Sequence, residues 1–88
     1  MKTVSLYYTT KFKKKLKDFP TKERANFLKK FKTFLDDPFE PSLKTHKLAG
    51  KLDNYWSFSL NYNLRVLFRF VNDTAVELID MGGHDIYK

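Results

Sequence analysis

Cysteine is absent from this 88-residue chain, which excludes both a disulfide framework and a thiolate metal site. No apolar run approaches the roughly 18 residues that a membrane-spanning helix needs, and the first residues lack an apolar stretch long enough for a secretory signal. We therefore expect a cytoplasmic protein that makes no contact with a membrane. Glycine is also scarce: the three glycines, Gly50, Gly82 and Gly83, form no phosphate-binding loop.

Most familiar catalytic signatures are missing as well. The two histidines, His46 and His84, lack the spacing of metal ligands, so we expect no metal and no other cofactor. The sequence has no Gly-x-Ser-x-Gly elbow, and no pair of carboxylates suited to glycoside hydrolysis is evident.

Positive charge is abundant, and it gathers in the first part of the chain. Residues 1–35 hold eleven Lys or Arg against two acids, whereas residues 36–88 hold six against eight. The excess has two readings, a pair of well-solvated helices or a surface that attracts a polyanion or an acidic protein. The length fits one domain over residues 1–88, and the 17% aromatic content suits a small, dense core.

Two patterns of apolar spacing divide the chain. Residues 4–8 read as a short strand, after which Thr9 or Thr10 can cap a helix over residues 11–19 that Pro20 ends. Thr21 resembles an N-cap for a second helix over residues 21–37, whose apolar residues form a single stripe. Apolar residues then alternate over residues 55–60, 64–71 and 75–81, the pattern of three strands.

This order predicts an α+β fold, β-α-α-β-β-β, with an antiparallel sheet and two helices packed on one of its faces. The other face would then stay free. Alternation places Arg65 and Arg69 on that free face, where two guanidinium groups can bind phosphates.

The remaining candidates for chemistry are histidine and arginine at a phosphodiester. Metal-free RNA cleavage needs a base for the 2′-hydroxyl proton, an acid for the leaving oxygen and cations for the charge on phosphorus. His46, before the middle strand, and His84, after the last strand, are placed at the rim of the sheet. The alternative for each histidine is a solvated loop residue.

The chain also resembles a known family. The segments that carry the resemblance are HKLAGKL (residues 46–52), YWS (55–57), RVLFRF (65–70) and DMGGHD (80–85). In this order they are similar to the RelE/ParE toxin superfamily, and most of all to its YafQ-like RelE/StbE branch. The order of elements matches over nearly the whole chain.

The resemblance implies a type II toxin, an endoribonuclease that cleaves mRNA in the ribosomal A site without a metal and so inhibits translation. It implies a cognate antitoxin as partner, with DNA bound only through the antitoxin complex. The catalytic residues that it implies are His46, Arg65 and His84. The RNA-binding residues expected beside them are Lys47, Lys51, Ser59, Asn63, Arg69 and Tyr87.

One strand departs from the YafQ-like pattern. Ser59 and Asn63 stand where that branch has a further histidine and an aspartate, and neither can act as a general base near neutral pH. Two alternatives therefore stay open on the same fold: a ParE-type inhibitor of DNA gyrase, and a basic binding module without catalysis.

Overall fold

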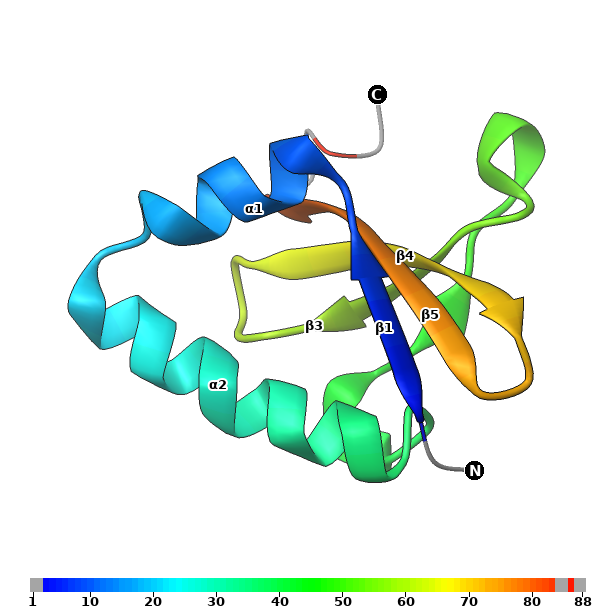
Figure 1. The fold of residues 1–88 in the computed structure, drawn as a ribbon, viewed down its shortest axis with the longest axis horizontal. Helices are drawn as coiled ribbons and strands as arrows, with labels where there is room; N and C mark the ends of the chain where they lie inside the picture. The colour runs from blue at the N-terminus through cyan, green and yellow to red at the C-terminus, as the bar shows by residue number, and fades with distance from the viewer. Residues whose placement is uncertain (1–2, 84–85, 87–88) are drawn as a thin grey trace.

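The computed structural model describes residues 3–83 and residue 86. Two α-helices, two short 3₁₀ turns and a five-stranded sheet make up the fold (Figure 1). The helical elements are α1 (Thr10–Lys17), α2 (Thr21–Asp36), η1 (Pro41–Leu43) and η2 (Gly50–Leu52). The strands are β1 (Ser5–Tyr8), β2 (His46–Lys47), β3 (Trp56–Ser59), β4 (Arg65–Asn72) and β5 (Ala75–Gly82).

The starts of the two helices differ in how they are capped. Thr9 caps α1, because its Oγ1 accepts a hydrogen bond from the backbone N–H of Phe12 at 3.0 Å. The prediction that Thr21 caps α2 is wrong: Pro20 occupies the cap position, and no side chain caps the helix there. Thr21 is the first residue of α2, since the fixed φ of proline already directs the chain into the helix.

Aromatic rings build the core between α2 and the sheet. Phe34 of α2 is fully buried and stacks on Phe58 of β3, with 4.4 Å between the ring centroids. Its ring also meets the edge of Phe68 of β4 at 4.9 Å. Each fully buried aromatic side chain contributes about 1.5–3 kcal/mol. The apolar stripe of α2 and the alternating apolar residues of β3 and β4 thus pack together as one core.

The sheet is mixed, whereas the sequence predicted a purely antiparallel one. Its strand order is β1-β5-β4-β3-β2, and four strands form an antiparallel meander from β2 to β5. The first strand pairs with the last in parallel, with Ser5 opposite Ala75. Side chains alternate in the same way in parallel and antiparallel strands, so the sequence pattern could not give the direction of β1.

The sheet has one strand more than predicted. Residues 46 and 47 form β2, an edge strand that pairs with β3, where the sequence suggested a loop. A two-residue strand is too short for alternation to reveal it.

The face of the sheet opposite the helices is covered over its middle, although the sequence predicted a free face. Ser57 is fully buried and Leu67 is 5% exposed, although both point away from α2. Arg65, the first residue of β4, and Arg69, four residues further along, lie on either side of Leu67 and are partly exposed on this face. The face is therefore buried at Ser57 and Leu67 but partly accessible at the two arginines. In the part of the chain that the structure describes, no helix is long and apolar enough to cross a membrane.

Candidate functional site

The strand register places His46 on the same face as Arg65. His46 lies opposite Ser57, and Ser59, two residues further along β3, lies opposite Arg65. Directly paired residues point to the same face, and so do residues two apart on one strand. Two strand spacings and two residues of rise separate the Cα atoms of His46 and Arg65 by about 12 Å. An imidazole and a long guanidinium side chain can meet at one phosphodiester across that distance.

The hydrogen bond of His46 defines which ring nitrogen is free. Its Nδ1 lies 3.0 Å from the backbone carbonyl oxygen of Lys44, and a carbonyl can only accept. Nδ1 therefore carries the proton of the neutral ring, and Nε2 keeps its lone pair. The side chain is exposed, so this lone pair faces solvent at the margin of the sheet. The geometry is that of an available general base.

Ser59 holds Arg65 in place. The Ser59 Oγ accepts a hydrogen bond from Nη1 of Arg65 at 2.8 Å, between the two opposed residues at the start of β4. This bond uses one of the five guanidinium N–H groups and leaves the others for a ligand. No ion pair involves Arg65 among the residues described. Its positive charge is therefore available to an anion.

Arg69 is placed differently. Its Nε donates to Oε1 of Glu77 at 2.7 Å, and the two form a partly exposed ion pair between β4 and β5. Arg69 lies about 13 Å from Arg65 along the same strand. An RNA phosphate at Arg69 has to compete with Glu77, so the two arginines are not an equivalent pair.

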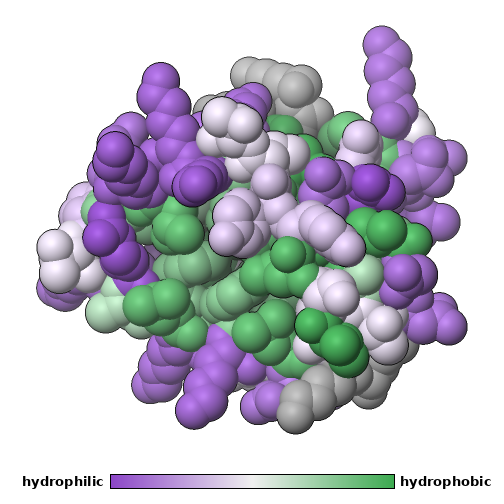
Figure 2. Space-filling view, in the orientation of Figure 1, coloured by the Kyte–Doolittle hydropathy of each residue, from purple (hydrophilic) through white to green (hydrophobic). Residues whose placement is uncertain are grey.

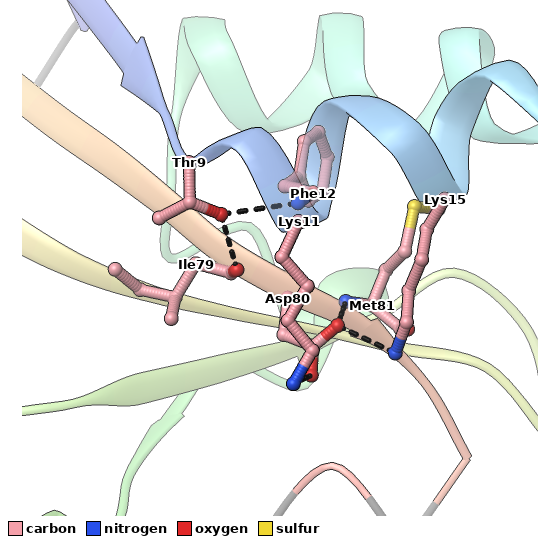
Figure 3. A network of polar contacts seen from close by, with 7 residues as sticks. All are labelled: Thr9, Lys11, Phe12, Lys15, Ile79, Asp80 and Met81. Atoms are coloured by element: carbon pink, nitrogen blue, oxygen red, sulfur yellow. Dashed lines mark hydrogen bonds and ion pairs between the residues drawn. The ribbon is translucent and has the colours of Figure 1, made fainter.

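Asp80 connects helix α1 to β5. Its Oδ1 lies 2.7 Å from Nζ of Lys15, and its Oδ2 lies 3.2 Å from Nζ of Lys11 (Figure 3). The backbone N–H of Met81 also donates to Oδ1, at 2.8 Å. Burial alone raises the pKa of Asp80, but the hydrogen bonds from Lys15, Met81 and Lys11 outweigh it and lower the pKa below its ordinary value. Two of the helix lysines thus share one carboxylate, which offsets one of their two positive charges.

A second pocket, of about 450 Å³, opens beside the β3–β4 hairpin. It contains three cationic side chains, Lys30, Lys44 and Arg65, and no carboxylate. The other lining residues are Asn26, Ser42, Ser59, Leu60, Asn61 and Tyr62. Among the described residues, none of the three cations is in an ion pair. This pocket is where the unpaired positive charge of the site gathers.

The other expected RNA-binding residues are scattered. Lys47 lies opposite Trp56, and strand alternation points it to the face opposite that of His46. Lys51 is exposed in η2, and Asn63 is exposed in the hairpin loop. His84 and Tyr87 lie outside the described residues. The structure thus brings His46, Ser59 and Arg65 onto one face but separates Lys47 from them.

An apolar groove of about 540 Å³ lies between α1, α2 and β1. Figure 2 shows hydrophobic residues gathered over this region, with hydrophilic side chains around them. The apolar lining is Leu6, Tyr8, Phe12, Leu16, Phe27, Leu28, Phe31 and Leu78, and the cationic residues are Lys13, Lys17 and Arg24. Leu28 is 56% exposed there. An exposed apolar surface of this kind is typical of a binding partner's footprint.

Sequence reasoning missed Asp80, Lys30, Lys44 and Tyr62 as residues of these sites. Asp80 was visible as one of two acids in the last strand, in the segment between Ile79 and Met81 where apolar residues flank it. Tyr62 was visible as an aromatic residue between two asparagines at the hairpin. The two lysines carry no such signal, because only the fold brings them together. Among residues 3–83 and 86, no group of three or more His, Asp or Glu could hold a metal.

Neither a protein-family model nor a curated protein matches the sequence. Solved structures do match, and they are bacterial and archaeal toxins. The YoeB/ParE toxin from Agrobacterium tumefaciens superposes with a TM-score of 0.78 at 18% identity, over 92% of this chain and 99% of that one. The YafQ protein from E. coli gives a TM-score of 0.74 at 18% identity, over 94% and 96% of the two chains.

The archaeal RelE–RelB complex from Pyrococcus horikoshii contains a third match, with a TM-score of 0.72 at 18% identity, over 92% and 94% of the two chains. This chain therefore has the RelE/ParE toxin fold, as the sequence resemblance implied. Coverage is nearly complete on both sides, so the likeness extends to the whole domain.

Proposed function

We propose that this chain is the toxin of a type II toxin–antitoxin system and that it cleaves messenger RNA without a metal, at the ribosome. The observation that carries the proposal is the exposed imidazole of His46, whose Nε2 is free and which shares a face with the unpaired guanidinium of Arg65. The RelE/ParE fold supports the same conclusion.

In the proposed reaction, Nε2 of His46 removes the proton of a 2′-hydroxyl group. The 2′ oxygen then attacks the adjacent phosphorus, and the bond from phosphorus to the 5′ oxygen breaks. His84, assigned from the family resemblance, protonates that leaving oxygen. Arg65 stabilises the negative charge that develops on the phosphoryl oxygens. The products are a 2′,3′-cyclic phosphate and a free 5′-hydroxyl.

In this proposal Ser59 positions Arg65 rather than acting as a base, because its Oγ is already hydrogen-bonded to the guanidinium. Ser59 therefore has a role at this position of a YafQ-like site, although that branch has a further histidine there. Lys51, Asn63 and Tyr87 remain proposed RNA contacts. Arg69 joins them only when its ion pair with Glu77 opens.

We further propose an acidic antitoxin as the partner. The apolar groove with Lys13, Lys17 and Arg24 supports this part, since apolar contact and opposite charge both favour an acidic amphipathic segment. One of the matching structures is itself a RelE–RelB complex. A short acidic protein encoded beside this gene should relieve growth arrest when the two are expressed together. Unrelieved arrest would contradict its role as antitoxin.

The test of the nuclease is cleavage of a message by the purified protein with and without ribosomes, in the presence of EDTA. We expect cleavage products that end in a cyclic phosphate, and no cleavage at a nucleotide that lacks its 2′-hydroxyl. Arg65→Ala should lower the rate about 10²–10³-fold, since it removes stabilisation of the transition-state charge. His46→Ala should lower the rate about 10²–10⁴-fold through loss of the base.

The matched control is Asp73→Asn, in the exposed β4–β5 turn, which should cleave at the wild-type rate. Cleavage that survives both active-site substitutions would refute the assigned roles. Absence of cleavage together with inhibition of gyrase supercoiling would favour the ParE-type alternative.

A further inference from the structure

The tip of the β3–β4 hairpin exposes an aromatic ring to solvent, and hydrogen bonds hold the backbone that carries it. Tyr62 is 92% exposed, the largest exposure among the large hydrophobic side chains described. A side chain of this size is more stable when buried, and here the fold leaves it open. The ring therefore suggests a surface on which a flat ligand stacks.

Hydrogen bonds on both sides of Tyr62 hold its backbone. The Oδ1 of Asn61 accepts from the backbone N–H groups of Asn63 and Leu64, at 2.9 and 3.0 Å. The N–H of Leu60 donates to the carbonyl of Leu64 at 2.9 Å, which closes the loop. The amide of Asn26 on α2 donates to the carbonyl of Leu60 at 3.3 Å and ties the hairpin to the helix. The loop backbone that carries the ring is thus already ordered, so binding does not have to order it.

The ring borders the pocket that holds the free cations. Tyr62 lines the same cavity as Lys30 of α2, Lys44 after η1 and Arg65 of β4. Some other cations differ, since Lys11 and Lys15 of α1 are paired with Asp80 and Arg69 of β4 is paired with Glu77. An aromatic platform beside unpaired cations has the composition of a single-stranded nucleic-acid site.

Lys44 links the pocket to His46. The backbone carbonyl of Lys44 fixes the His46 ring, and the side chain of Lys44 lines the pocket. Arg65 belongs to both places. An RNA chain bound at His46 and Arg65 therefore extends toward the pocket with its neighbouring nucleotide.

We propose that this pocket is a nucleotide-binding subsite for single-stranded RNA, in which Tyr62 stacks on a base next to the scissile one while Lys30 and Lys44 hold its phosphate. The inference rests on the proposed nuclease function and adds a determinant of substrate position to it. It assigns to RNA three residues, Tyr62, Lys30 and Lys44, that the family resemblance did not include among the site residues.

The experiment measures binding apart from cleavage. The probe is a fluorescein-labelled single-stranded RNA with 2′-O-methyl groups throughout, which lacks the 2′ protons that the cleavage reaction needs. Fluorescence anisotropy with the full-length protein gives the dissociation constant at several salt concentrations. Tyr62→Ala should weaken binding about 5- to 150-fold, and Tyr62→Phe should bind like the wild type because stacking needs only the ring.

Lys30→Ala tests the phosphate contact. It should lower the slope of log K against log salt by about 0.7, the share of one phosphate on a single strand. The matched controls are Tyr7→Ala, an exposed tyrosine on the far edge strand β1, and Lys32→Ala, an exposed lysine of α2 outside the pocket. Both should bind within twofold of the wild type.

Equal affinity of wild type and Tyr62→Ala for the probe would overturn the subsite, even if the protein cleaves RNA. Loss of binding to a protein partner but not to RNA in Tyr62→Ala would overturn it too, because the ring would then be a protein contact. Failure of the nuclease function shows separately, as absence of cleavage of unmodified RNA. Thermal unfolding checks that each variant is folded.

Discussion

The carboxylate of Asp80 gives a quantitative prediction for stability. Asp80→Asn keeps the size of the side chain and an oxygen that can accept from the Met81 N–H, but it removes the charge. The change therefore isolates the two ion pairs that join α1 to β5 at 2.7 and 3.2 Å.

The magnitude follows from the exposure of the partners. Hydrogen bonds to buried charged groups are worth about 1.5–3 kcal/mol each, whereas exposed ion pairs are worth about 0.2–1 kcal/mol. The Asp80 side chain is 7% exposed, but those of Lys15 and Lys11 are 37% and 67% exposed, so water can replace part of the loss. We expect Asp80→Asn to lower the free energy of unfolding by about 1–2 kcal/mol and Tm by about 5–15 °C.

The pH dependence has a definite sign. The pKa of Asp80 is lowered in the folded protein, so its stabilising effect is complete above the unfolded pKa of about 3.9 and is lost as the pH falls through the folded pKa. The gap in stability between wild type and Asp80→Asn should thus be widest at pH 7 and should close below about pH 4.

Urea denaturation followed by circular dichroism at pH 7, 4 and 2.5 measures this gap. Asp73→Asn, a change to an exposed turn carboxylate, is the matched control and should stay within about 0.5 kcal/mol of the wild type. A difference in the free energy of unfolding that is the same at every pH, or absent at pH 7, would refute the claim that the Asp80 charge stabilises the contact between α1 and β5.

Two further predictions concern local structure. Thr9→Ala should lower the free energy of unfolding, measured by urea denaturation, by about 1–2 kcal/mol, and Thr9→Ser should lower it much less. The reason is that the Thr9 hydroxyl caps α1 and also donates to the Ile79 carbonyl at 2.7 Å. Equal losses in the two variants would show that the methyl group matters instead. The backbone of Lys44 is left-handed, with φ 53°, a conformation that is strained for any residue with a side chain. Lys44→Gly should therefore raise the free energy of unfolding by about 0.5–1 kcal/mol while weakening RNA binding. A loss of stability in this variant would contradict backbone strain at Lys44.

Much of the fold was predictable because its pattern is local. The stripe of α2 and the alternation of β3, β4 and β5 each follow from spacing within one segment. The direction of β1 was not predictable, because it depends on how two helices return the chain to the sheet. The two-residue strand β2 was missed for a related reason, since only its pairing with β3 defines it.

The site was predictable in its residue types but not in its pairings. His46 and Arg65 were candidates from sequence, and the register places them on one face. Nothing in the sequence shows that Glu77 pairs with Arg69 or that Ser59 holds Arg65, because these contacts cross strands. The pocket cations Lys30 and Lys44 come from a helix and a turn, so their proximity is a property of the tertiary structure.

The parallel pairing of β1 with β5 has a consequence for synthesis. The Thr9 hydroxyl, at the start of α1, bonds to a carbonyl 70 residues later in the chain. On a translating ribosome β1 emerges first and finds its partner only after β5 has left the exit tunnel, since non-local pairing has to wait for both segments. A chain that terminates before β5 loses both the partner of β1 and the anchor of α1. Premature termination should therefore release an unfolded peptide rather than a partly active protein.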